Sequence, residues 1–110
     1  MELKKSHTGE VAEALEADAR IERVWYPGLP SFPQYDLARR QLRYAGGLIT
    51  FDVVGGREAG QRFVESTEIA QLATSLGGPE TLVTHPASTT HAGLLPEELA
   101  DAGIGEGTIR

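Results

Sequence analysis

The 110-residue sequence contains no cysteine, so it offers neither a disulfide framework nor a thiolate nucleophile. Long apolar runs are also missing, and no stretch approaches the roughly 20 residues that a membrane-spanning helix needs. The first eight residues have no apolar segment of the kind found in a signal peptide. Lysine occurs only twice, as Lys4 and Lys5. A cytoplasmic location is the default expectation for such a sequence.

Positive charge is in short supply. Lysine and arginine together number 10 against 16 acidic residues, which gives a net charge of −6. The charges are spread along the chain. Nucleic-acid binding requires a basic face, and adhesion to anionic membranes requires basic clusters. We therefore expect no nucleic-acid partner and no membrane partner.

Length and composition indicate a single domain over residues 1–110. The apolar fraction of 40% and the charged fraction of 24% are those of an ordinary globular protein. A chain of this size can bury a core, but its folding leaves little surplus stability.

Helix and strand patterns are mixed along the chain. Helices are predicted over residues 10–17, 34–43, 57–66 and 97–102, and strands over 21–26, 48–54, 80–84 and 108–110, while the short apolar stretch 69–74 is ambiguous. Such a mixture predicts an α/β fold of the two-layer α+β sandwich type, a small mostly antiparallel sheet with helices on one face. The pattern over residues 10–17 is that of the last part of a longer helix, and the last strand pattern stops with the chain, so we expect a fragment truncated at both ends.

Five motifs follow one another in order: Val24-Trp-Tyr-Pro-Gly-Leu29, Ser31-Phe-Pro-Gln-Tyr-Asp-Leu-Ala-Arg-Arg-Gln41, Gly46-Gly-Leu-Ile-Thr-Phe51, Gly55-Gly-Arg-Glu-Ala-Gly-Gln-Arg-Phe63 and Ser75-Leu-Gly-Gly-Pro-Glu-Thr-Leu-Val-Thr-His-Pro-Ala-Ser-Thr-Thr-His-Ala92. Together they resemble the C-terminal domain of the Cys/Met-metabolism family of pyridoxal-phosphate (PLP) enzymes. That family includes cystathionine γ-synthases, cystathionine γ-lyases, methionine γ-lyases and O-acetylhomoserine sulfhydrylases. The resemblance implies the C-terminal, substrate-clamping domain of a fold-type I PLP enzyme.

The resemblance also implies three substrate-binding residues. Arg110 matches the family arginine that holds the substrate carboxylate, a role suited to a planar guanidinium with two parallel donors. Ser75 matches the serine of the family's "S-L-G" turn, and Thr90 matches the threonine of its "T-H" pair. No catalytic, cofactor-binding or metal-ligating residue is expected within the chain.

The lysine that carries PLP in this family lies in an "S-x-T-K" segment, and neither Lys4 nor Lys5 has that context. The resemblance thus implies PLP in the intact enzyme, without covalent binding to this chain. It implies a separate PLP-binding domain, a homo-oligomer, and γ-elimination or γ-replacement on homoserine esters, methionine or cystathionine. The chain alone is expected to be inactive. Thr74 stands where cystathionine-specific members often carry glutamate, which favours homoserine-ester sulfhydrylation or methionine γ-lysis.

Other interpretations remain open. The chain could be a non-catalytic, stand-alone remnant or a subunit-interaction module. Arg110 could be a solvated terminus, and Ser75 could cap the turn before Gly77-Gly78. His85 and His91 lack the partners of a zinc site, and a turn-stabilising role is favoured for both.

Overall fold

The computed structural model of the chain describes residues 2–74 and 80–110, with side chains from residue 7 onward. The chain divides into two compact units, Met1–Phe51 and Asp52–Arg110. Each unit has its own buried residues. The expectation of a single domain stays a prediction.

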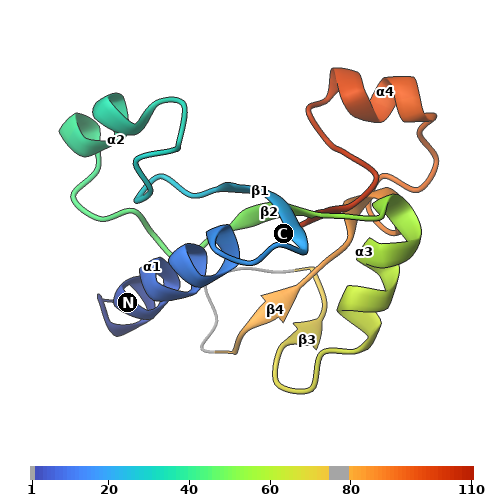
Figure 1. Ribbon diagram of the computed structural model, residues 1–110, viewed down its shortest axis with the longest axis horizontal. Helices are drawn as coiled ribbons and strands as arrows, with labels where there is room; N and C mark the ends of the chain where they lie inside the picture. Colours follow the sequence, from blue (N-terminus) through green and yellow to red (C-terminus); the bar gives the residue numbers. More distant parts are fainter. Residues whose placement is uncertain (1, 75–79) are drawn as a thin grey trace. The chain divides into compact units, whose positions relative to one another are not determined.

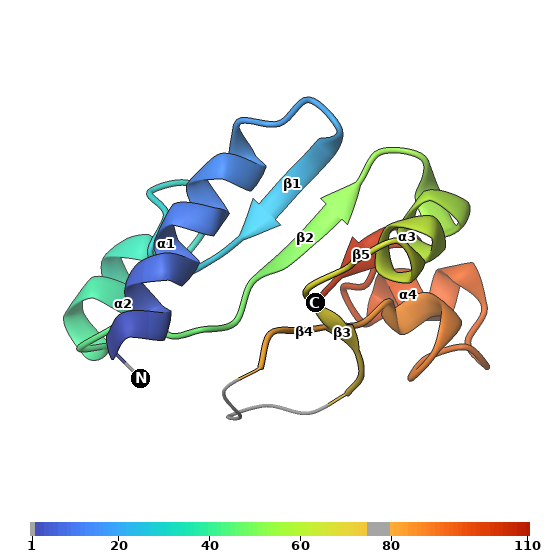
Figure 2. The same cartoon turned by 90° about the horizontal axis from the view of Figure 1, so that it is seen from below.

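The first unit contains two helices, α1 (Glu2–Glu16) and α2 (Tyr35–Gln41), and the strand β1 (Ile21–Trp25). The strand β2 (Thr50–Val53) begins in this unit, where β1 is its hydrogen-bonded neighbour. In Figure 2, α1 lies along β1, and the arrows of β1 and β2 point in opposite directions. The buried apolar side chains of this unit are Ala12, Val24, Tyr26, Leu29 and Phe51.

A tyrosine anchors the long connection between β1 and β2. Tyr26 is buried, and its hydroxyl donates a hydrogen bond to the Gly46 carbonyl at 2.8 Å. Burial raises the pKa of this phenol above its usual value of 10.0. The bond fixes the far end of the segment that carries α2, because Gly46 lies close to the start of β2.

The second unit contains helices α3 (Gly56–Glu65) and α4 (Pro96–Asp101), the 3₁₀ turn η1 (Pro86–Ser88), and the short strands β3 (Gln71–Leu72), β4 (Leu82–Val83) and β5 (Thr108–Ile109). Strand β5 is the hydrogen-bonded neighbour of β2, and α3 and η1 both contact β5. The buried apolar side chains are Val53, Val64, Ala87, Leu99 and Ile109. This core holds the C-terminal strand in place.

The predicted fold class is confirmed as a mixture of helices and strands with a small antiparallel sheet. One pair of strands differs from the antiparallel expectation. β3 and β4 lie side by side in Figure 1 and pair in parallel, with Gln71 opposite Leu82 and Leu72 opposite Val83. This pair forms a separate two-stranded sheet.

Two glycines make the turn from β2 into α3 possible. Gly55 has φ of 111° and Gly56 has φ of 68°, in the region that glycine occupies without steric cost. The structure confirms the turn that the Gly55-Gly56 pair predicts. Over the described part of the chain, none of the helices has the length and apolar character to cross a membrane.

Candidate functional site

Arg110 follows β5, and its backbone is fixed by Thr84. The Arg110 N–H donates to the Thr84 carbonyl at 3.0 Å, and the Thr84 N–H donates to the Arg110 carbonyl at 2.9 Å. The preceding residue, Ile109, is fully buried. The base of the Arg110 side chain therefore has a defined position.

The start of the C-terminal strand is held equally firmly. The Thr108 hydroxyl donates to the Asp52 carboxylate and accepts a hydrogen bond from the Gly105 N–H at 2.8 Å. The Val53 N–H donates to the Gly107 carbonyl at 3.0 Å. These bonds tie the segment before Arg110 to the end of β2.

The Arg110 side chain itself is exposed. Among the residues that the structure describes, no side chain forms an ion pair or hydrogen bond with its guanidinium. A guanidinium free of internal partners can bind a carboxylate through two parallel hydrogen bonds. This arrangement suits the predicted role of Arg110.

Thr90 lies on the turn that follows Thr84. The Thr84 and Thr89 hydroxyl oxygens are 3.3 Å apart, and the Thr89 hydroxyl donates to the His85 carbonyl at 2.8 Å. Thr90 is exposed, and its hydroxyl lies 2.8 Å from Nδ1 of His91. The structure thus brings the backbone of Arg110 to the segment that carries Thr90.

Ser75, the third predicted substrate-binding residue, lies outside the described residues. Its role stays a prediction. Thr74 next to it is described and exposed.

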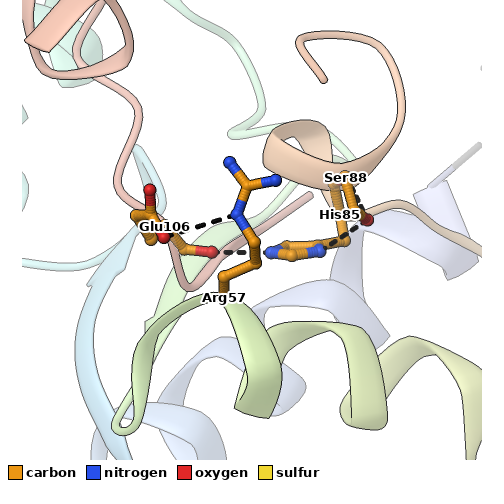
Figure 3. Close-up of polar contacts among 4 residues, drawn as sticks. All are labelled: Arg57, His85, Ser88 and Glu106. Carbon is orange, nitrogen blue, oxygen red and sulfur yellow. Dashed lines mark hydrogen bonds and ion pairs between the residues drawn. The ribbon is translucent and has the colours of Figure 1, made fainter. Parts of the chain in front are cut away.

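A buried histidine joins this turn to the C-terminal strand. His85 is fully buried; its Nδ1 lies 2.7 Å from the Ser88 hydroxyl and its Nε2 lies 2.6 Å from the Glu106 carbonyl. The carboxylate of Glu106 in turn contacts Nε of Arg57 at 3.4 Å. Figure 3 shows these four residues.

The sequence predicted a turn-stabilising role for His85, and the bond to Ser88 lies within its own turn. What the sequence missed is the bond to Glu106, on a different segment. The His85-Pro86 pair indicates where the strand ends. No sequence pattern predicts that the His85 ring binds the backbone carbonyl of a residue as distant as Glu106, because every residue has such a carbonyl.

A Schiff base with PLP requires a lysine amine, and both lysines, Lys4 and Lys5, lie in the part of α1 whose side chains are not described. The expectation that PLP does not bind covalently to this chain therefore stays a prediction. Within residues 7–74 and 80–110, no cluster of histidine, aspartate and glutamate could hold a metal ion. The donor set instead suits an anionic ligand at Arg110.

Comparison with known proteins gives a consistent set of relatives. A model of the family described as Cys/Met metabolism PLP-dependent enzyme matches residues 1–110. An L-methionine gamma-lyase of Porphyromonas gingivalis is 50% identical over 100 residues, which is 91% of this chain and 25% of that protein. An O-succinylhomoserine sulfhydrylase of Pseudomonas aeruginosa matches with the same identity and coverage.

A solved structure agrees with these sequence matches. The crystal structure of cystathionine gamma synthase from Xanthomonas oryzae pv. oryzae, in complex with aminoacrylate and cysteine, superposes with a TM-score of 0.88 and 38% identity. The superposition covers 99% of this chain and 28% of that one. The chain thus spans about a quarter of the length of the relatives it matches.

Proposed function

The chain belongs to the Cys/Met metabolism PLP-dependent enzyme family, and from this premise we propose that it supplies the α-carboxylate site for a sulfur amino-acid substrate. The observation that carries the proposal is the exposed guanidinium of Arg110, which pairs with no side chain among residues 7–74 and 80–110, on a backbone held by Thr84. A positioned guanidinium lowers the entropic cost of orienting a bound substrate. Thr90 and Ser75 add neutral hydroxyl groups to the same site.

The proposed reaction class is γ-elimination or γ-replacement on homoserine esters, methionine or cystathionine. PLP supplies the electron sink for such chemistry when it is bound. The residues of this chain bind and orient the substrate. Cofactor binding belongs to a part of the enzyme beyond these residues, and a homo-oligomer in the cytoplasm completes the proposal.

Within this class, sulfhydrylation and methionine γ-lysis are favoured. Thr74 is uncharged and exposed, so it offers no carboxylate to a distal ammonium group like that of cystathionine. Two of the relatives are named a methionine gamma-lyase and a succinylhomoserine sulfhydrylase, each 50% identical to this chain over the matched residues. Both observations favour sulfhydrylation or methionine γ-lysis over reactions of cystathionine.

The test is Arg110→Lys in the full-length enzyme that carries this chain. Lysine keeps the charge but loses the two-pronged geometry. A charge-assisted hydrogen bond contributes roughly 1.5–3 kcal/mol, so kcat/KM is expected to fall about tenfold to a hundredfold. The visible absorbance of bound PLP should stay unchanged.

The matched control is Arg62→Lys, at an exposed position of α3 in the same unit. It makes the same chemical change at a solvent-exposed residue that has no predicted role in substrate binding, and kcat/KM should not change. An Arg110→Lys enzyme with unaltered kcat/KM would show that the carboxylate is held by another group.

A further inference from the structure

The partners of the two ring nitrogens of His85 determine which nitrogen donates a hydrogen bond. Its Nε2 lies 2.6 Å from the Glu106 carbonyl, and a carbonyl oxygen can only accept a hydrogen bond. Nε2 must therefore carry the hydrogen. In the neutral ring, Nδ1 then accepts from the Ser88 hydroxyl at 2.7 Å. Both ring nitrogens of this fully buried side chain are satisfied.

The backbone of α3 packs closely against the ring of His85. Gly60 of α3 faces it, and a Cβ atom at residue 60 would come within 2.7 Å of Nε2 and 2.8 Å of Cδ2 of His85. The ring thus lies against a helix backbone on one side, while its two nitrogens are bound to Ser88 and Glu106 (Figure 3). A buried ring held in this way can transmit its position to whatever it binds.

What it binds is the segment that carries Arg110. The ring of His85 holds Glu106 near the start of this segment, and the neighbouring backbone of Thr84 holds Arg110 at its end. Two adjacent residues therefore fix the Glu106–Arg110 segment at both ends. The Glu106 carboxylate gains a further contact with Arg57 at 3.4 Å.

The same histidine also fixes the turn that leads to Thr90. The backbone carbonyl of His85 accepts the hydrogen bond of the Thr89 hydroxyl at 2.8 Å. His85 is thus bonded to both segments that carry described substrate-site residues, one through its ring and the other through its backbone.

We infer that His85 is a positioning residue for Arg110, acting through the Nε2–H bond to the Glu106 carbonyl. The inference rests on the proposed function, because it concerns the direction from which the guanidinium meets the substrate carboxylate. The bond sets where the C-terminal strand lies. His85 does not touch the substrate.

The experiment compares two variants of the full-length enzyme, His85→Asn and His85→Gln. The glutamine amide reaches as far as Nε2 of histidine and keeps a donor for the Glu106 carbonyl, whereas the shorter asparagine amide does not. The readout is kcat/KM for the amino-acid substrate divided by kcat/KM for its α-carboxamide. Simple loss of folded enzyme lowers both values equally, so it leaves this ratio unchanged.

A buried hydrogen-bond acceptor left without a donor is costly, and we expect the ratio to fall about tenfold in His85→Asn. It should stay within about twofold of wild type in His85→Gln. Equal ratios in wild type and His85→Asn, or equal losses in the two variants, would overturn the inference.

Arg110→Lys separates this inference from the function on which it rests. If Arg110→Lys leaves the ratio unchanged, the proposed function fails. If Arg110→Lys lowers the ratio and His85→Asn does not, only the positioning role fails. In the double variant, the ratio should be no lower than in Arg110→Lys alone, because His85 acts through Arg110; multiplied losses would contradict that.

Discussion

Arg110 and Thr84 exchange two backbone hydrogen bonds, at 3.0 and 2.9 Å. The pair joins the residue after β4 to the residue after β5, so the arginine is supported by two segments. Its side chain can then offer its guanidinium from a fixed point. Pre-orientation of this kind reduces the entropy lost when a ligand binds.

Thr90 and Ser75 should matter less than Arg110. Each offers a neutral hydroxyl, whose hydrogen bond contributes about 0.5–1.5 kcal/mol, against roughly 1.5–3 kcal/mol for a bond to a charged group. We expect Thr90→Val and Ser75→Ala each to lower kcat/KM by no more than about tenfold in the full-length enzyme. Steady-state kinetics measures this, and a loss in either variant larger than that of Arg110→Lys would reverse the assigned ranking.

Gly60→Ala should destabilise the protein although it improves helix propensity. Alanine in a helix interior gains up to about 1 kcal/mol over glycine, but the new Cβ would lie 2.7 Å from Nε2 of His85. That nitrogen is bound to the Glu106 carbonyl and cannot easily move. Overpacking costs about 1–3 kcal/mol, so we expect a net loss of unfolding free energy in urea denaturation.

Gly9→Ala provides the control for this substitution. Gly9 lies inside α1, and among the described residues no atom outside the local helix backbone lies within 4 Å of a Cβ built there. The same change should therefore stabilise the protein, by up to about 1 kcal/mol. If both variants were stabilised, the packing of the histidine ring against α3 would be contradicted.

Tyr26→Phe should destabilise the first unit. The substitution removes the hydroxyl that donates to the Gly46 carbonyl and leaves that carbonyl without this partner. The expected cost is about 0.5–1.5 kcal/mol of unfolding free energy, measured by urea denaturation at neutral pH.

Tyr26 also predicts a pH dependence. Burial raises the pKa of this phenol in the folded state above 10.0, so the contribution to stability is fully present below that value and is lost as the pH rises through the folded pKa. In the wild type, the unfolding free energy should decline above pH 10, and the decline should be smaller in Tyr26→Phe. If the unfolding free energy declined equally steeply with pH in the wild type and in Tyr26→Phe, Tyr26 would not be the cause of the decline.

The 110-residue chain expressed alone should neither bind PLP covalently nor turn over substrate. Its only lysines, Lys4 and Lys5, lack the "S-x-T-K" context of the family's cofactor lysine. After incubation with PLP and borohydride reduction, mass spectrometry should find no adduct specific to one lysine. A specific adduct accompanied by lyase or sulfhydrylase turnover would contradict this expectation.

Much of the secondary structure follows from the sequence. The helix predicted over 57–66 is α3 (Gly56–Glu65), and the strand predicted over 48–54 contains β2 (Thr50–Val53). Both have clear periodicity and a Gly-Gly turn between them. The helix predicted over 10–17 begins much earlier, as α1 (Glu2–Glu16). Its first half contains lysine, serine, histidine and threonine, which form no apolar face that would reveal a helix.

The pairing of strands and the contacts between elements far apart in the chain could not be predicted from the sequence. Strands β3 and β4 have two residues each, too few to show which strand they pair with or in which direction. The contact between Gly60 and His85 joins separate elements, and the bond from His85 goes to a backbone carbonyl, a group that every residue has. The substrate-binding roles of Arg110 and Thr90 were predicted from motifs. The hydrogen bonds that hold their segments, from Thr84 to Arg110 and from Thr89 to His85, could be identified only in the structure.

The most direct test of the central claim is a measurement of ligand binding to the full-length enzyme. The dissociation constants of glycine and glycinamide, which differ only in the carboxylate, can be compared by calorimetry in the wild type and in Arg110→Lys. If Arg110 binds the carboxylate, the wild type should prefer glycine by at least about tenfold, as expected for a charge-assisted bond, and Arg110→Lys should lose most of this preference. An undiminished preference for glycine in Arg110→Lys would show that the carboxylate binds elsewhere.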